Sequence, residues 1–271
     1  MITETRPAPM PKPPDSYGGR AAWIALGSIF AVASLVYGAF FIVQLLAYAT
    51  TSTREVFVED VRSVDVRNGA GKTRIVATDD DEVVVEASIT YGLQKPDNEA
   101  TIEGDQLVVR SSCPGFSQWC NVGYTIYVPA DVAVVVRGSG GGVTVEGITG
   151  PIDASSSGGG VRVVDVRGPL RLRSSGGVIT GERVRSGTVD ANSSGGGVRL
   201  TFAEPPRDVA VHSSGGGVTV VVPETPEGYN IQASSSGGSV RTSEVRHDPA
   251  SDRRIEVSSS GGGVTVRPPG E

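Results

Sequence analysis

The Ser-Gly-Gly-Gly motif is the first candidate for chemistry, because glycine-rich loops can hold phosphate groups with their backbone N–H groups. The motif or a close variant occurs seven times, and each copy is followed by a valine. A phosphate-binding P-loop requires a lysine after the glycines and then a helix. No lysine follows any copy, and the residues that do follow have the pattern of a strand. The motif therefore predicts a repeated structural corner.

The serines of the motif could be nucleophiles only if a positioned base activates them. The chain contains two histidines, His212 and His247, which lie at unrelated positions of the repeat. No G-x-S-x-G sequence occurs either. We therefore expect these serines to cap the corners through hydrogen bonds between their hydroxyl groups and the backbone.

Three carboxylates share one position of the repeat. Asp153, Asp190 and Glu256 each lie eight residues before the valine that ends their copy. Enzymes that hydrolyse glycans use paired carboxylates as acid, base or nucleophile, and alternation along a strand would place these three outward. A glycan-active β-helix enzyme is therefore kept as the second alternative. Because no acid recurs in every copy, we expect no catalytic residues and no bound cofactor.

The acidic run Asp79 to Glu82 could bind Ca²⁺, which takes several oxygen ligands. It lies between two strand patterns, however, and has neither an EF-hand loop nor a GGxGxD repeat. We expect a solvated turn here and no metal site.

Cys113 and Cys120 flank a short segment that contains the turn-forming pair Pro114-Gly115. This arrangement favours a disulfide in an oxidising compartment, which would stabilise the chain by roughly 2–3 kcal/mol. Buried free thiols are the alternative. A metal or redox site is disfavoured, because the spacing is not C-x-x-C.

The N-terminus predicts a membrane anchor. Residues 1–20 are polar and proline-rich, which is typical of a disordered tail. Residues 21–48 contain no charged side chain, and a helix of about 20 apolar residues spans a bilayer. Trp23 and Tyr48 lie near its two ends, where aromatic rings favour the membrane interface. We expect a single-pass protein with a cytoplasmic tail, a transmembrane helix over 21–48, a linker over 49–53 and an extracytoplasmic domain.

The alternative is a cleaved signal peptide, since Ala47-Tyr48-Ala49 has the small-x-small form of a cleavage site. The apolar run is about twice as long as the usual ~7–15 residues of a signal sequence. The anchor is therefore favoured.

Four small residues, Gly27, Ala31, Ser34 and Gly38, share one face of the expected helix. Small residues let membrane helices approach closely, so this face could form a homo-oligomer. Small residues are also common in membrane helices that do not associate, and that interpretation stays open.

A repeat of about 20 residues fills the C-terminal half of the chain. The valines that end its copies are Val143, Val161, Val178, Val198, Val218, Val240 and Val264. In six of the seven copies apolar residues stand at positions −9 and −7 from the valine, and five copies have another at +2. In the Val178 copy Leu170 and Leu172 stand at −8 and −6 instead. In the other six copies the apolar residues before the glycines lie an odd number of positions from those after them. In a straight strand they would face opposite sides, so the chain must bend at the glycines if both are to face one core. We expect the Val178 copy, which has one glycine fewer and places Thr180 at +2, to have a different corner.

Stacking such units would bury a continuous core, which predicts an all-β fold of β-solenoid or β-helix type. The domain is expected over 54–268, with an irregular β part over 54–136 and the repeats over 137–268. Pro268-Pro269 is expected to protect the last edge of the stack.

The sequence resembles the bacterial putative-adhesin family, a β-repeat domain often found behind a single membrane helix. The resemblance covers roughly residues 55–266 and is carried by VRSVDVRNGAGKTRIVATDDDEVVVEA, by the Tyr-x-Ile-x-Val-Pro step and by the repeated Gly-Gly-Val-x-Val. It implies an extracytoplasmic β-solenoid and brings no set of functional residues with it.

Composition excludes one class of partner: the net charge is −6 and the lysines and arginines form no cluster, so we expect no nucleic acid. We expect a non-catalytic surface adhesin or scaffold module that binds wall glycan or a protein partner. An accessory or sensor protein of an envelope-stress response is the alternative. The expected contact residues are the outward positions Arg162, Arg171, Arg173, Arg199, Arg241, Thr144, Thr219 and Thr265.

Overall fold

The computed structural model describes residues 17–46, 49–80, 82–113 and 120–270, which fall into two compact units. The first contains one helix, α1 (Tyr17–Leu46). Within it, the stretch Trp23–Val43 is long and apolar enough to cross a membrane, and its large side chains are exposed. The predicted tail over residues 1–16 and the end of the predicted span at residues 47–48 lie outside the described residues.

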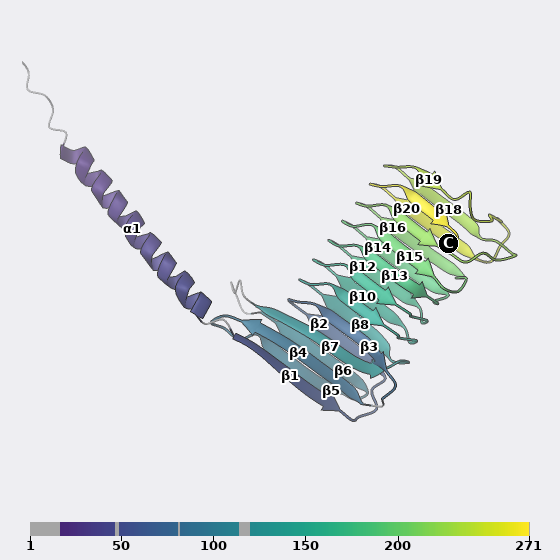
Figure 1. Ribbon diagram of the computed structural model, residues 1–271, viewed down its shortest axis with the longest axis horizontal. Coiled ribbons are helices and arrows are strands. Elements are labelled where there is room, and N and C mark those ends of the chain that lie inside the picture. The colour runs from purple at the N-terminus through teal and green to yellow at the C-terminus, as the bar shows by residue number, and fades with distance from the viewer. Residues whose placement is uncertain (1–16, 47–48, 81, 114–119, 271) are drawn as a thin grey trace, which may run out of the picture. The chain divides into compact units, whose positions relative to one another are not determined.

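The second unit is mostly β-strand and is built from two open sheets (Figure 1). Sheet A has eleven strands, in the spatial order β1 (Ala49–Phe57), β4 (Val83–Tyr91), β7 (Asn121–Pro129), β3 (Thr73–Thr78), β9 (Val143–Glu146), β11 (Val161–Val164), β13 (Ile179–Val184), β15 (Val198–Phe202), β17 (Val218–Val221), β21 (Val264–Arg267) and β19 (Val240–Arg241). Sheet B has ten, in the order β18 (Asn230–Ser235), β20 (Arg254–Ser259), β16 (Asp208–Ser213), β14 (Thr188–Ser193), β12 (Leu170–Ser174), β10 (Ile152–Ser156), β8 (Ala133–Gly138), β2 (Ser63–Asn68), β6 (Gln106–Ser112) and β5 (Asp97–Glu103).

The linker predicted over 49–53 is wrong. These residues belong to β1, which pairs with β4 along all nine of its residues. Strands β1, β4 and β5 pair antiparallel, whereas the other pairings are parallel.

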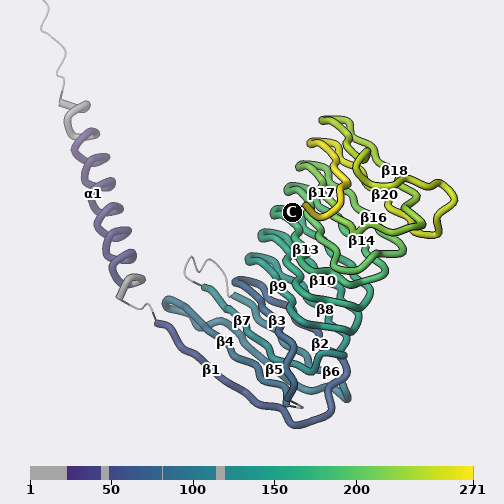
Figure 2. The backbone as a smooth tube through the Cα atoms, turned by 45° about the vertical axis from the view of Figure 1, so that its right-hand side comes forward, coloured from purple at the N-terminus to yellow at the C-terminus, as the bar shows by residue number. Residues whose placement is uncertain are grey.

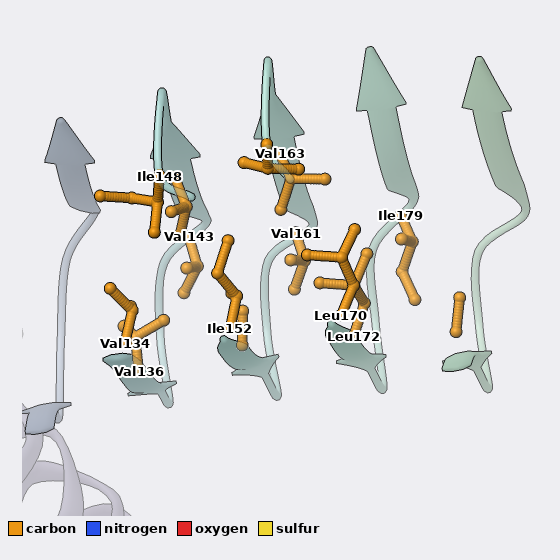
Figure 3. Close-up of a cluster of buried hydrophobic side chains, with 14 of the residues drawn as sticks. Val134, Val136, Val143, Ile148, Ile152, Val161, Val163, Leu170, Leu172 and Ile179 are labelled. Carbon is orange, nitrogen blue, oxygen red and sulfur yellow. The ribbon is translucent and has the colours of Figure 1, made fainter. Parts of the chain in front are cut away.

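Each parallel strand of sheet B continues through a corner into a strand of sheet A, and we call such a pair a rung. In the rung β10–β11, Ala154 and Val161 are both buried although their parity along the chain is opposite. The corner between them reverses the parity, as the sequence predicted. Figure 3 shows the apolar side chains of several rungs filling the space between the two sheets.

The corner glycines are required by close stacking. A β-carbon on Gly158 would lie 2.9 Å from the carbonyl oxygen of Gly140, and one on Gly176 would lie 2.8 Å from that of Gly158. The bend in these tracts does not use a left-handed backbone, since the glycines with positive φ among the described residues are Gly71, Gly104, Gly147 and Gly228. Neighbouring corners simply leave no room for a side chain between them.

The sequence predicted a different corner before β13, and this prediction is wrong: the corner has the same length as the others. Ile179 is in register with Val161 and Val198, so Ile179 and not Val178 occupies the inward position. Val178 replaces the third glycine, and its side chain points outward with 48% exposure. Thr180 consequently also faces outward.

The spatial order of the rungs departs from the chain order at both ends (Figure 2). Near the C-terminus, β20–β21 lies between β16–β17 and β18–β19. Near the N-terminal end of the unit, β2–β3 lies between β6–β7 and β8–β9. Pro268-Pro269 therefore follows an internal strand, and the prediction that it protects the last edge is wrong.

The rung at the C-terminal end of the stack has the weakest core. Ile231 and Ala233 are only partly buried, and Val240 is 43% exposed. By contrast, Ile255 and Val264 of the rung inserted before it are fully buried. The end position exposes least apolar surface when the rung with the fewest large apolar side chains occupies it.

Candidate binding surface

The buried serines form a ladder of backbone caps. The hydroxyl of Ser156 donates to the carbonyl oxygen of Gly141 on the neighbouring rung at 2.7 Å and accepts the N–H of Gly159 at 3.0 Å. The same bonds recur at Ser174, Ser213, Ser235 and Ser259. These hydroxyls are therefore structural, as the sequence indicated.

Three backbone N–H groups of the corner before β11 are occupied. Those of Ser157 and Gly158 each donate at 2.9 Å to carbonyl oxygens of the preceding rung, at Gly138 and Ser139, and that of Gly159 donates to the hydroxyl of Ser156. These three groups are not free to hold a phosphate group, and no lysine follows the glycines, so the corner lacks the features of a P-loop.

The histidines do not reach the buried serines. His212 lies on the outer face of sheet B, where its Nδ1 atom is 2.9 Å from the hydroxyl of Ser258 and its Nε2 atom is 3.3 Å from that of Ser214. In a Ser-His-Asp triad a carboxylate orients the histidine ring, whereas here a second serine bonds to the other ring nitrogen. His247 accepts the backbone N–H of Ile231 at 3.2 Å.

The candidate carboxylates lie on the same outer face of sheet B, each beside an arginine. Asp153 is 3.6 Å from Arg173, and Asp190 is 3.6 Å from Arg171. Strand β12, which carries both arginines, lies between the strands that carry the two acids. Glu256 pairs with Arg254 at 2.7 Å.

The acidic run is exposed at Asp79 and Asp80, while Asp81 lies outside the described residues. The N–H of Asp80 donates to the hydroxyl of Thr78 at 3.2 Å, which closes a turn. Within the described residues, no three His, Cys, Asp or Glu side chains gather closely enough to hold a metal ion.

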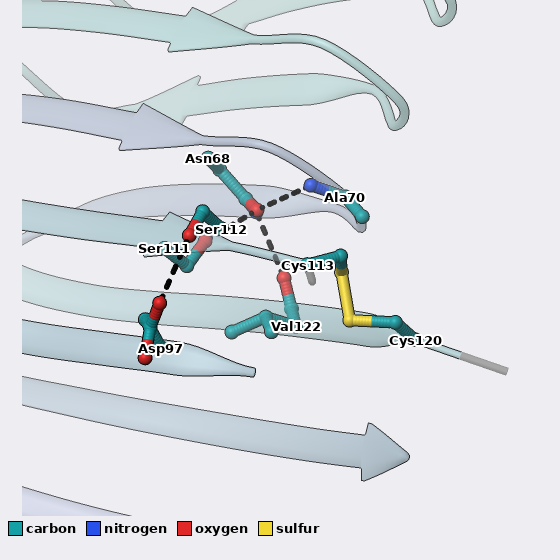
Figure 4. The surroundings of a disulfide bond; sticks show 8 residues. All are labelled: Asn68, Ala70, Asp97, Ser111, Ser112, Cys113, Cys120 and Val122. Atoms are coloured by element: carbon teal, nitrogen blue, oxygen red, sulfur yellow. Dashed lines mark hydrogen bonds between the residues drawn. A yellow bond between two sulfur atoms is a disulfide. The ribbon is translucent and has the colours of Figure 1, made fainter. Parts of the chain in front are cut away.

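A disulfide joins Cys113 to Cys120 at the corner of rung β6–β7, with their Cα atoms 5.9 Å apart (Figure 4). The segment between them, including Pro114-Gly115, lies outside the described residues. Ser111 is in register with Asn68, the last residue of β2 before its corner. The disulfide, two residues further on, therefore lies at the place where the later rungs have their Ser-Gly corner.

Asn68 is a buried polar residue that the sequence analysis missed. Its side-chain N–H₂ group donates to the carbonyl oxygen of Val122 at 2.8 Å and to the hydroxyl of Thr73 at 3.1 Å. Its oxygen accepts the N–H of Ala70 at 3.1 Å and the hydroxyl of Ser111 at 3.0 Å. The sequence contains a signal for it: Val64 and Val66 stand nine and seven residues before Thr73, the same phase as in the later repeats.

One row of outward side chains crosses all eleven strands of sheet A, and we call it the Arg/Thr row. In spatial order its members are Arg54, Glu86, Thr125, Arg74, Thr144, Arg162, Thr180, Arg199, Thr219, Thr265 and Arg241. The row carries five arginines and one carboxylate, in a chain whose net charge is −6. It is the strongest concentration of positive charge along any row of this sheet.

The arginines of the row differ in their ion pairs. Arg74 binds Glu146 through two N–H groups, at 2.8 and 3.2 Å, and this pairing raises the pKa of its guanidinium. Arg162 binds Glu182 at 2.8 Å. Arg199 and Arg241 are exposed and have no carboxylate within 4.0 Å among the described residues.

The row brings together six of the eight outward residues expected from the sequence. Arg171 and Arg173 are the exceptions, because they lie on sheet B. Members of the row that the sequence analysis missed are Arg54, Arg74, Glu86, Thr125 and Thr180. On α1, Gly27 and Gly38 have open space around them, and self-association through this face stays a prediction.

No protein-family model and no curated protein match this chain. Solved structures that are similar include a putative cell adhesion protein from Clostridium sporogenes, 11% identical, with a TM-score of 0.38 over 81% of this chain and 100% of that one. A putative adhesin from Parabacteroides merdae is 9% identical, with a TM-score of 0.38 over 82% and 96% of the two chains. A putative lipid binding protein from Parabacteroides distasonis is 13% identical, with a TM-score of 0.35 over 82% and 97%. The adhesin names agree with the resemblance found in the sequence.

Proposed function

We propose that this chain is a non-catalytic surface module, in which α1 anchors a β-solenoid to a membrane and the Arg/Thr row binds a component of the cell envelope. The solenoid assignment is supported by the rungs, each of which stacks its corner and its two strands on those of its neighbours. The row is the observation on which the binding role depends.

The row suits binding to an extended partner better than catalysis. Its side chains project from neighbouring paired strands, all but the two edge strands β1 and β19 being paired on both sides, so their spacing of about 4.8 Å is preset. The arginine fork also recognises carboxylate and phosphate groups well. The serines and carboxylates that could have served catalysis are instead hydrogen-bonded to the backbone or paired with arginines.

Anchoring is supported by the apolar helix and by the short connection to the domain. Residues 47 and 48 alone separate α1 from β1. The proposed orientation places the N-terminus in the cytoplasm and the disulfide outside, in an oxidising compartment. Protease added to intact cells should then remove the β domain and leave α1 in the membrane fraction. A β domain that becomes sensitive only after lysis would contradict this orientation.

The binding role can be tested by co-sedimentation of the full-length chain, in detergent micelles, with purified cell walls. Replacing Arg162 and Arg199 together by Gln should weaken binding about tenfold, because two exposed charge contacts of ~0.7 kcal/mol each are lost. The matched control replaces Arg171 and Arg173 on sheet B by Gln and should leave binding unchanged. Equal losses in the two double variants, or no binding by the wild-type chain, would refute the proposal.

A further inference from the structure

A groove lies on the outer face of sheet A over strands β1, β4, β7 and β3. It has a volume of about 590 Å³ and is bordered by Arg54, Lys72 and Arg74, with Ser52, Ser88 and Gly123 at its base. A second hollow of about 740 Å³ shares Lys72, Ser88 and Gly123 and extends toward Cys120. The two hollows adjoin at these three shared residues, and we call the pair the Gly123 groove.

Gly123 is the residue that leaves this groove open. It lies inside β7, between two paired strands, and its φ is not positive. A β-carbon there would lie 3.8 Å from the carbonyl oxygen of Lys72 and 3.9 Å from that of Ser88, which is ordinary contact. The fold therefore does not require a glycine, and a glycine inside a strand weakens it.

Gly181 in β13 provides the contrast. A β-carbon on Gly181 would lie 2.8 Å from Leu200 and 2.9 Å from Val184, so core packing explains that glycine. No such contact explains Gly123. A glycine within a strand often marks a bulge, a tight bend or a place where another molecule approaches the backbone closely. Strand β7 keeps an unbroken register with β4 across Gly123, so a bulge does not explain this glycine and close approach of another molecule does.

The chemistry of the groove favours an anion that also carries hydroxyl groups. Arg54, Lys72 and Arg74 face one carboxylate, Glu86, which is 3.9 Å from Arg54. Arg74 is already bound to Glu146, whereas Lys72 is exposed and has no carboxylate within 4.0 Å among the described residues. Ser52 and Ser88 are in register with each other and with Gly123, so their hydroxyl groups flank the bare strand.

The length of the groove selects a chain rather than a small ion. Residues 121–125 of β7 all line one hollow or the other except Val122, which is buried. Five strand residues span about 13–16 Å, which is longer than one phosphate or carboxylate group. We propose that the Gly123 groove binds a segment of an acidic glycan, with a negative group at Lys72 and sugar hydroxyls at Ser52 and Ser88.

This inference rests on the proposed binding role and names the class of its ligand. It is tested by titrating the full-length chain in detergent micelles with an oligogalacturonate, and in parallel with a neutral cello-oligosaccharide, inorganic phosphate, single-stranded DNA and anionic lipid vesicles. We expect binding of the oligogalacturonate alone among these probes, weakened by salt.

Two variants locate the site. Gly123→Val fills the base of the groove and should abolish binding while the thermal unfolding temperature stays equal or rises, because valine suits a strand. Lys72→Gln, which leaves the base open, should weaken binding at least tenfold. Arg171→Gln on sheet B is the control and should bind as the wild type does.

The proposal falls if Gly123→Val and Lys72→Gln both bind like the wild type, or if the neutral sugar, phosphate, DNA or vesicles bind as tightly as the acidic one. Its failure can be told apart from that of the proposed function. Cell-wall binding that depends on Arg162 and Arg199 but not on Lys72 or Gly123 would keep the surface module and reject the groove.

Discussion

Asn68 connects three segments that are far apart in the sequence. Its side chain bonds to Val122 at the start of β7, to Ser111 at the end of β6 and to its own corner at Ala70. It is 1% exposed, so none of these bonds can be replaced by water without opening the structure.

We therefore expect Asn68→Ala to lower the free energy of unfolding by about 2–4 kcal/mol, because several buried polar groups lose their partner. Urea denaturation followed by circular dichroism measures this change. Asn192→Ala is the control: that side chain is partly exposed and, among the described residues, bonds to Asp190 alone, so its loss should change stability by less than about 0.5 kcal/mol. Equal effects would mean that the Asn68 network is not a stabilising unit.

We expect the protein to lose stability at alkaline pH because of the buried side chain of Tyr229. It is fully buried, its hydroxyl donates to the carbonyl oxygen of Pro223 at 2.7 Å, and burial raises the pKa of its phenol to about 12. The folded protein therefore holds this proton more tightly than the unfolded chain, whose tyrosine pKa is about 10. Its contribution to stability is complete below pH ~10 and is lost as the pH rises toward 12.

Comparing the wild type with Tyr229→Phe isolates this effect from the other tyrosines. The stability difference between the two proteins should shrink between pH ~10 and 12, measured by urea denaturation at each pH. A difference that stays constant over that range would show that Tyr229 does not titrate with unfolding.

At the scale of the elements, the corners are held by stacking of backbone on backbone. A β-carbon on Gly176 would lie 2.8 Å from the carbonyl oxygen of Gly158, whereas one on Gly187 would have open space around it. Gly176→Ala should cost about 1–3 kcal/mol through overpacking. Gly187→Ala should be neutral or stabilise the protein by up to about 1 kcal/mol, because the unfolded chain loses freedom. Thermal unfolding of both variants decides this, and a neutral Gly176→Ala would contradict the stacking.

The repeat phase predicted the elements well and failed where one residue changed the register. Positions −9, −7, 0 and +2 identified inward residues such as Ile152, Ala154 and Val161. The phase misplaced Val178, because a valine in the place of the third glycine looks identical to the valine that follows the glycines. It also missed rung β2–β3, in which Asn68 replaces the serine and Thr73 replaces the valine.

For the whole molecule, the strand order could not be derived from the sequence. Every rung presents the same row of backbone N–H and C=O groups to its neighbours. The backbone hydrogen bonds are therefore the same for any order of the rungs, and they do not select one order. Differences in side-chain size do carry a signal, since the rung with Ala233 and Val240 is the one placed at the end. The Arg/Thr row was likewise only partly foreseen, because four of its members come from strands that precede the repeats: Arg54, Glu86, Thr125 and Arg74.

The strand order makes a prediction for truncation after Asp252. Strand β18 pairs with β20, so removing β20 and β21 should expose the amides of Asn230–Ser235 as well. Hydrogen exchange of the full-length and truncated chains measures this loss of protection. Truncation before Pro268, which leaves both strands in place, is the control. Unchanged protection of β18 in the shorter chain would contradict the order described.

The same insertion has a consequence for biogenesis. Residues 254–267 are synthesised after residues 230–241, yet they supply the rung that lies between β16–β17 and β18–β19. Until β20 and β21 have been made, β18 and β19 have no strand to pair with. This end of the stack can therefore fold only after residue 267 has been synthesised, and not rung by rung as the chain grows.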